Sequence, residues 1–162
     1  MTQSIPRALV AQALDQPEDN LPPGDLPMDR FAQRFLMFLR DTEDDEAEGD
    51  DFEAHPEVWT AVLATVLATD HPALSFAVQE ALVAEAQTPE DLGLIAAGPM
   101  TELFATQGPD LLPQIEAAAT SPRFAMALGA LAPEGHGNPL FWARLQGMAK
   151  GHPDMADELP PV

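Results

Sequence analysis

Carboxylates are the residues of this chain best suited to chemistry, and many of them gather in one stretch. "DTEDDEAEGDDFE", residues 41–53, holds nine of them in thirteen positions and contains no Lys or Arg. Oxygen-rich loops of this kind can hold calcium. The best EF-hand register starts at Asp44, with Glu46, Glu48 and Asp50 at the third, fifth and seventh positions and Gly49 at the sixth, where the loop turns. His55 then falls where a bidentate Glu must close the shell, and Asp51 replaces the usual apolar residue, so we expect no metal site.

Other residues that could support catalysis are few. No histidine lies in the HExxH pattern of a zinc hydrolase, no Cys is available as a nucleophile, and GxSxG and GxxxxGK[ST] motifs are absent. His136 lies between glycines near Glu134 and could act as a general base, although this sequence is also typical of a plain turn. A carboxylate-dependent enzyme would need a pocket that brings Glu102, Glu116 or His136 together. We expect no enzyme activity, no catalytic residue and no cofactor.

Net charge gives the strongest indication of function. The chain has 27 Asp and Glu against 7 Lys and Arg, a formal net charge of −20. This charge disfavours direct binding to DNA or RNA, because their phosphates are also negative. It favours a basic protein surface as the partner, because opposite charges accelerate association. The alternative explanation is that the charge serves solubility alone.

The acidic run allows three interpretations. Its carboxylates could bind a basic partner, could imitate nucleic-acid phosphates toward a basic groove, or could form a solvated loop, which Asp, Gly and mutual repulsion favour. We take the first as the leading hypothesis. The partner-binding residues would then be Glu43, Asp44, Asp45, Glu46, Glu48, Asp50, Asp51, Glu53 and Glu57.

The elements that must position these residues are helical almost throughout. Apolar residues recur at spacings of three and four, and no alternating strand pattern is found. Proline favours the first turn of a helix, where its missing N–H costs nothing. Helix starts are therefore expected at Pro6, Pro27, Pro56, Pro72, Pro89, Pro99, Pro122 and Pro139. We predict an all-α single domain of about eight or nine short helices, in orthogonal or superhelical packing.

The domain is expected to span residues 1–151, with an acidic loop at 41–55 and a flexible tail at 152–162. The first helix is expected over 5–14 with Ser4 as its cap, and the last over 139–150. A helix over 27–40 places a stripe of Phe residues in the core, and a helix over 56–69 places Trp59 there. In "TPED", Thr88 is expected to cap a helix whose first turn contains Asp91.

One part of the chain resembles a known family. The similarity lies in the corner Ala97, Gly98, Pro99, in Glu102, Leu103, Gly108, Ile115, Glu116 and Ala118, in the start Ser121, Pro122, Arg123, Phe124, and in Trp59 upstream. Over about residues 57–131 these positions resemble a family of small bacterial all-helical domains of unknown function. Thr101 and the acidic run depart from its pattern. The resemblance implies a helical fold and a bacterial or phage setting, and it implies no activity.

Together these features predict a non-enzymatic binding module that resembles an immunity protein or an inhibitor of nucleic-acid machinery. A self-associating scaffold, possible as a homodimer through the apolar corner at 94–104, is the alternative. No apolar segment approaches the roughly 18 residues of a membrane span, so we expect a cytoplasmic protein without membrane contact.

Overall fold

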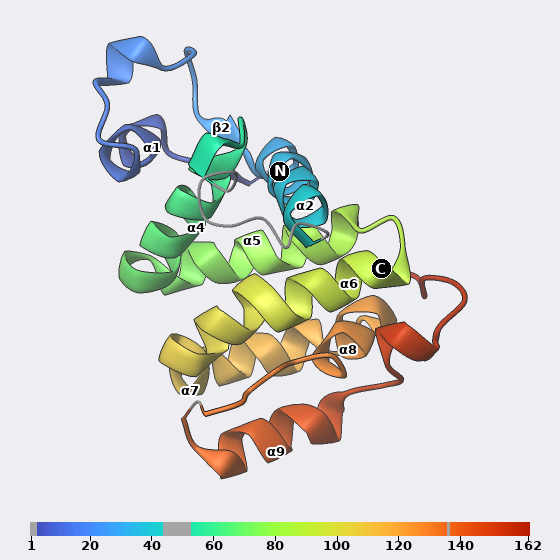
Figure 1. Ribbon diagram of the computed structural model, residues 1–162. Helices are drawn as coiled ribbons and strands as arrows, with labels where there is room; N and C mark the ends of the chain where they lie inside the picture. The colour runs from blue at the N-terminus through green and yellow to red at the C-terminus, as the bar shows by residue number, and fades with distance from the viewer. Residues whose placement is uncertain (1–2, 44–52, 136) are drawn as a thin grey trace.

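The computed structural model describes residues 3–43, 53–135 and 137–162, and within them the chain is all-α (Figure 1). The prediction of the fold class is confirmed, and the described residues form eight α-helices, within the expected number. Their bounds are α1 Arg7–Ala13, α2 Met28–Glu43, α4 Val58–Asp70, α5 Pro72–Glu85, α6 Pro89–Ile95, α7 Thr101–Ala118, α8 Pro122–Leu128 and α9 Pro139–Met148. Short helical turns lie at Glu18–Asn20 (η1), Ala96–Met100 (η2) and Pro153–Met155 (η3).

The helices form a stack in which α5 is central. It packs against α2 and α4 on one side and against α7 and α8 on the other, while α9 follows beyond α7 and α8 (Figure 1). The Phe stripe of α2 lies in the core as expected, with Phe31, Phe35 and Phe38 buried. Trp59 packs on this cluster, its ring centroid 5.9 Å from that of Phe31. Burial of these aromatic side chains fixes α2 across the start of α4.

The N-terminus corrects two predictions. Ser4–Ile5 (β1) pairs in antiparallel fashion with Leu26–Pro27 (β2), although no strand was expected. Ser4 is therefore not a helix cap, and α1 begins at Arg7 after Pro6, which has no capping side chain. A strand of two residues is too short to show an alternating pattern, which is why the sequence does not reveal it.

The corner between α6 and α7 depends on Thr101. Gly98 has non-helical dihedral angles and Pro99 follows it, so the backbone bends within η2. The Thr101 hydroxyl donates to the Ala96 carbonyl at 2.6 Å and accepts from the Ala132 amide at 3.0 Å. Thr101 is buried, so its hydroxyl depends on these protein partners. It thereby joins the corner to the chain that follows α8.

We predict that Thr101→Val lowers the free energy of unfolding by about 1 kcal/mol, because the Ala96 carbonyl and the Ala132 amide each lose their hydrogen bond to the hydroxyl. Valine has nearly the same shape, so the loss reports hydrogen bonding and not volume. Urea denaturation followed by circular dichroism measures the change. Thr106→Val is the control, because the Thr106 hydroxyl is bonded only to its own helix and is exposed. Equal stability of Thr101→Val and the wild type would contradict this role.

Residues 152–162, expected to form a flexible tail, lie against the helices. Pro153 is buried and η3 contacts α6. Arg123 at the start of α8 accounts for much of this contact. Its amide donates to the Pro161 carbonyl at 3.2 Å and its Nε donates to the Pro160 carbonyl at 2.9 Å. Its Nη1 also donates to the Ala84 carbonyl at 3.2 Å, so one side chain links the C-terminal segment to the end of α5.

Candidate functional site

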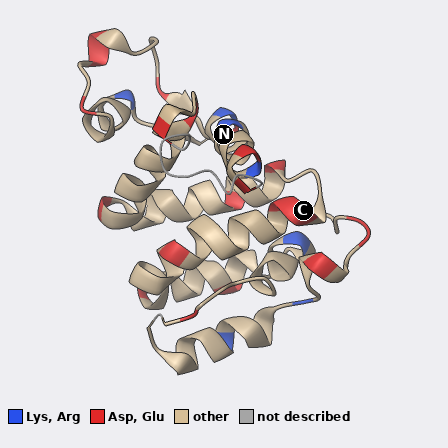
Figure 2. Ribbon diagram, in the orientation of Figure 1, with Lys and Arg blue, Asp and Glu red and all other residues tan. Residues whose placement is uncertain are grey.

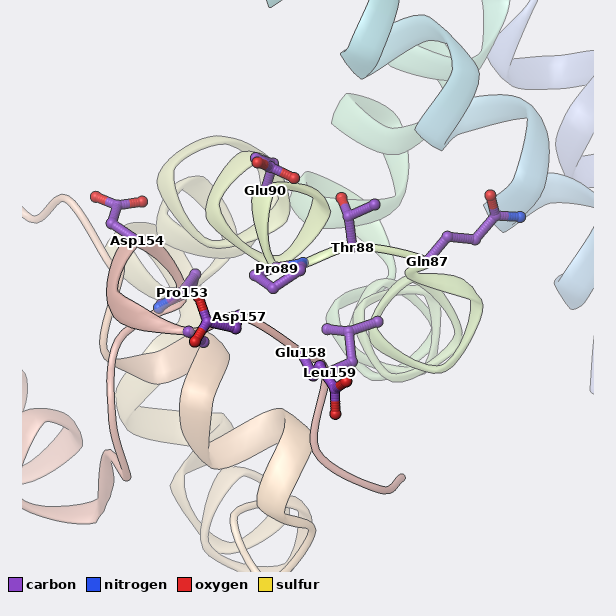
Figure 3. A pocket seen from close by; sticks show the side chains of 10 residues that line it. Gln87, Thr88, Pro89, Glu90, Pro153, Asp154, Asp157, Glu158 and Leu159 are labelled. Atoms are coloured by element: carbon purple, nitrogen blue, oxygen red, sulfur yellow. The ribbon is translucent and has the colours of Figure 1, made fainter.

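A groove of about 740 Å³ lies where the start of α6 faces the C-terminal segment. Residues 87–90 form one wall, and residues 153–159, apart from Met155, form the other. Figure 3 shows Glu90 on the first wall and Asp154, Asp157 and Glu158 on the second. These four side chains carry carboxylates, and no Lys or Arg lines the groove. We call this set of residues the acidic groove.

The first wall is held by a capping box. The Thr88 hydroxyl accepts from the Asp91 amide at 3.3 Å, and Asp91 Oδ2 accepts from the Thr88 amide at 3.1 Å and the Gln87 amide at 2.7 Å. This confirms the cap predicted from "TPED". Arg40, 51 residues away on α2, adds a bidentate ion pair, with Nε and one Nη each 2.7 Å from an oxygen of Asp91. The turn that forms the wall is thus fixed by four donors on one carboxylate.

Asp91 is 2% exposed, and the groups around its carboxylate determine its charge. Burial alone would raise the pKa of Asp91, but the hydrogen bonds from Arg40, Gln87 and Thr88 and the charge of Arg40 together lower it below its ordinary value of 3.8. The same pair raises the pKa of Arg40, chiefly through the hydrogen bond to Asp91. Asp91 is therefore ionised at neutral pH and its charge is compensated inside the fold.

The second wall is fixed by backbone contacts. The ring Nδ1 of His152 accepts from the Asp154 amide at 3.2 Å, which caps η3. The Lys150 amide donates to the Ala125 carbonyl at 3.0 Å, and Gly129, which follows the last residue of α8, lies directly against the Gly151 carbonyl. Arg123 holds the far end of the segment. The groove therefore has two ordered walls, and its carboxylates are exposed.

The acidic surface has few free counterions because five of the six arginines already bind groups of this chain. Arg34 pairs with Glu57, Arg40 with Asp91 and Arg144 with Glu116, while Arg7 and Arg123 donate to backbone carbonyls. Within the described chain, Arg30 and Lys150 are left without a side-chain partner. Figure 2 shows how Asp and Glu are distributed over the ribbon far more widely than Lys and Arg. The surplus of negative charge thus remains at the surface, where a partner can meet it.

The sequence-predicted partner residues lie in different environments. Glu43 ends α2 and Glu53 precedes α4, and both are exposed. Glu57 is only 7% exposed, because its Oε1 binds Arg34 at 2.7 Å and its Oε2 accepts from Trp59 Nε1 at 2.8 Å. It holds the start of α4 to α2 and is not free for a partner. The residues outside the described part of the chain are Asp44, Asp45, Glu46, Glu48, Asp50 and Asp51.

His55 joins the two flanks of the acidic run. Its Nε2 lies 3.0 Å from Asp41 Oδ2, and its Nδ1 accepts from the Glu57 amide at 3.0 Å. Because Nδ1 accepts, the proton of the neutral ring is on Nε2 and is donated to Asp41. The ring also lies edge-on to Phe38, with centroids 5.2 Å apart. His55, at the position where an EF-hand needs Glu, therefore links the end of α2 to the residues that precede α4.

Two of the residues considered for an enzyme, Glu102 and Glu116, are described, and they lie far apart. Glu102 and Glu116 lie 14 positions apart on α7, which is roughly 20 Å along a helix. His136 is outside the described residues. In the apolar corner, Ile95, Met100 and Phe104 are buried in the core of this chain, so they do not form an exposed docking patch.

The acidic groove was missed by the sequence analysis. Its two walls are more than sixty residues apart in sequence, and local patterns relate only residues within one element. The available signal was "HPDMADELPPV", which combines a capped turn, a leucine and three carboxylates. Such a segment can dock through its apolar and proline residues while it presents its charges outward.

The comparisons with known proteins give a family and no activity. The model of the family of unknown function DUF6869 matches residues 47–152. The searches of curated proteins and of solved structures returned no match. No helix in residues 3–43, 53–135 and 137–162 is both long and apolar enough to cross a membrane. The same residues contain no cluster of three or more His, Asp or Glu that could hold a metal ion.

Proposed function

The chain belongs to the family of unknown function DUF6869, and from its charge and its groove we propose that it is a non-enzymatic acidic module that binds a basic protein surface. One observation carries the proposal. The acidic groove is a concave site with four exposed carboxylates and no cation in its walls, in a chain of net charge −20. A protruding Lys or Arg side chain of a partner could enter this groove and would be attracted by its carboxylates.

The way the chain uses its arginines supports this function. A protein that needed charge only for solubility could leave its cations anywhere on the surface. Here Arg34, Arg40 and Arg144 pair with Glu57, Asp91 and Glu116 of the same chain, and no Lys or Arg lines the groove beside its carboxylates. Electrostatic steering then raises the association rate with a basic partner. A cytoplasmic inhibitor of nucleic-acid machinery, or an immunity-type protein of a bacterium or phage, would use this mechanism.

The test has two steps. The wild type is first used to capture a basic protein from its native lysate at low salt, and the association rate of that protein is then measured for the wild type and for three variants that each lose four carboxylates. The groove variant is Glu90→Gln, Asp154→Asn, Asp157→Asn, Glu158→Gln. We expect the association rate to fall roughly tenfold or more and its dependence on salt to weaken. The control variant is Glu18→Gln, Asp19→Asn, Glu102→Gln, Asp110→Asn, which neutralises four exposed carboxylates elsewhere.

Both variants change the net charge from −20 to −16, so a difference between them reports the groove and not the overall charge. A third variant neutralises Asp44, Asp45, Glu46 and Glu48 and tests the acidic run as a second contact. If the groove variant and its control bind equally, the groove is not the binding site. If the wild type captures no basic protein, the proposed function is wrong.

A further inference from the structure

A second cavity, of about 500 Å³, lies at the opposite end of the stack from α9. It is enclosed by α1, by residues 21–27, by the start of α2 and by the start of α4. Its lining is mainly apolar and includes Val10, Leu14, Leu26 and Trp59, and three arginines, Arg7, Arg30 and Arg34, also line it. We call it the arginine-rimmed pocket. Its volume falls in the range of small-molecule sites.

Positive charge at this place is unusual for this chain. Three of the seven Lys and Arg residues line this pocket, in a protein with a net charge of −20. Its two acidic residues, Asp25 and Glu57, each have a partner in this chain, and Glu57 is the one that pairs with a cation. Asp25 Oδ1 accepts from the Arg7 amide at 3.0 Å, and the oxygens of Glu57 are bound by Arg34 and Trp59.

Arg30 has no such partner. Its side chain is exposed and makes no hydrogen bond or ion pair with the described residues. Arg34 uses one Nη for Glu57, and a guanidinium has five N–H donors, so it keeps donors for a second anion. Two guanidinium groups on successive turns of α2 therefore border an apolar cavity with unused donors.

The walls of the pocket are held in place before any ligand arrives. The Arg7 guanidinium donates to the carbonyls of Glu18 and Leu21, the latter at 2.9 Å, and so fixes residues 18–21 against α1. Pro22 and Pro23 restrict the next turn, and Gly24 completes it at φ +89°, a conformation that other residues rarely adopt. A preformed pocket loses little conformational entropy when a ligand binds.

We propose that the arginine-rimmed pocket binds a small carboxylate with an apolar body, of the size of a medium-chain fatty acid. The carboxylate pairs with Arg30 and Arg34, and the apolar body packs on Trp59, Val10 and Leu14. A small ligand fits better than an acidic protein, because a macromolecular polyanion would be repelled by the net charge of −20. A single carboxylate meets little of that repulsion and gains charge-assisted hydrogen bonds.

Isothermal titration calorimetry with decanoate, kept below its micelle concentration, tests this site. Arg30→Gln removes a cation that has no structural partner, so the fold is expected to remain intact. We expect saturable binding to the wild type and a Kd about tenfold higher for Arg30→Gln, the loss of one charge-assisted contact. Decanol should bind wild type and Arg30→Gln equally, because it lacks the charge.

Lys150→Gln is the matched control, because Lys150 is also exposed, lies outside the pocket and changes the net charge by the same amount. Its Kd for decanoate should stay within about twofold of the wild type. Quenching or a shift of Trp59 fluorescence on binding, absent in Trp59→Phe, places the ligand in the pocket. Absence of saturable decanoate binding, or equal losses in Arg30→Gln and Lys150→Gln, would overturn the proposal. The groove variants described above should leave this binding unchanged.

Discussion

Replacing Arg40 with methionine is expected to lower the free energy of unfolding by about 3 kcal/mol at neutral pH. The change leaves the carboxylate of Asp91 buried, with only the neutral amides of Gln87 and Thr88 as donors. The expected value lies at the low end for a broken buried pair, because the Arg40 side chain is 37% exposed and water can partly take its place. Urea denaturation followed by circular dichroism measures it.

The pH dependence of this loss identifies its cause. In the wild type the lowered pKa of Asp91 contributes stability that is fully present above the ordinary value of 3.8 and is lost as the pH falls through the folded-state pKa. Without Arg40, burial raises the pKa of Asp91, so the carboxyl group takes up a proton more easily. The difference between wild type and Arg40→Met should therefore shrink below about pH 4.

Two further variants make this prediction specific. Lys150→Met removes an exposed cation and is expected to change stability by less than about 0.5 kcal/mol. Asp91→Asn combined with Arg40→Met should cost less than the sum of the two single changes, because the two residues form one pair. Additive effects, or a pH-independent loss in Arg40→Met, would show that the ion pair is not the source of the stability.

Replacing Gly129 with alanine is expected to lower the free energy of unfolding by about 2 kcal/mol, because the new methyl group has no space. A Cβ at this position would lie 2.3 Å from the Gly151 carbonyl oxygen and 3.1 Å from the Met126 carbonyl oxygen. Gly129 has φ −66°, which alanine adopts without strain, so the cost comes from the contact alone. The segment after α9 must move outward, and with it the second wall of the acidic groove.

Hydrogen exchange gives the local measurement for Gly129→Ala. The Lys150 amide, bonded to the Ala125 carbonyl in the wild type, should lose protection, while amides in α5 should keep theirs apart from the general loss of stability. Gly147→Ala is the control, because a Cβ there meets nothing within 4 Å and Gly147 lies inside α9. It should stabilise the protein by up to about 1 kcal/mol. Unchanged Lys150 exchange in Gly129→Ala would contradict the predicted displacement.

Local signals predicted the helices well where one residue determines the boundary. Pro72, Pro89, Pro122 and Pro139 are each the first residue of a helix, because the proline ring suits the first turn. Pro6 and Pro27 instead precede helices, and Pro27 ends β2, whose pairing with Ser4 depends on a residue more than twenty positions away. Proline restricts its own φ and favours an extended residue before it, but it does not decide whether that extended segment pairs with a distant strand.

The sites were less predictable than the helices, since both cavities are assembled by long-range contacts. The capping role of Asp91 follows from its spacing to Thr88, yet its pairing with Arg40 requires knowledge of how α2 crosses α6. Glu57 continues the acidic stretch in sequence, but the fold turns it inward to Arg34 and Trp59. The family match over residues 47–152 agrees with the resemblance noted at residues 57–131.

The pairing of arginines with other groups of the chain also determines where trypsin can cut the native protein. Trypsin cuts after Lys or Arg, and the sequence offers none between Arg40 and Arg123, so complete digestion yields an 83-residue fragment that carries α4 to α7. In the native state the side chains of Arg40 and Arg123 are held by Asp91 and by backbone carbonyls and cannot enter the enzyme's specificity pocket. Cleavage at these two residues therefore measures opening of the contacts that hold the two walls of the acidic groove.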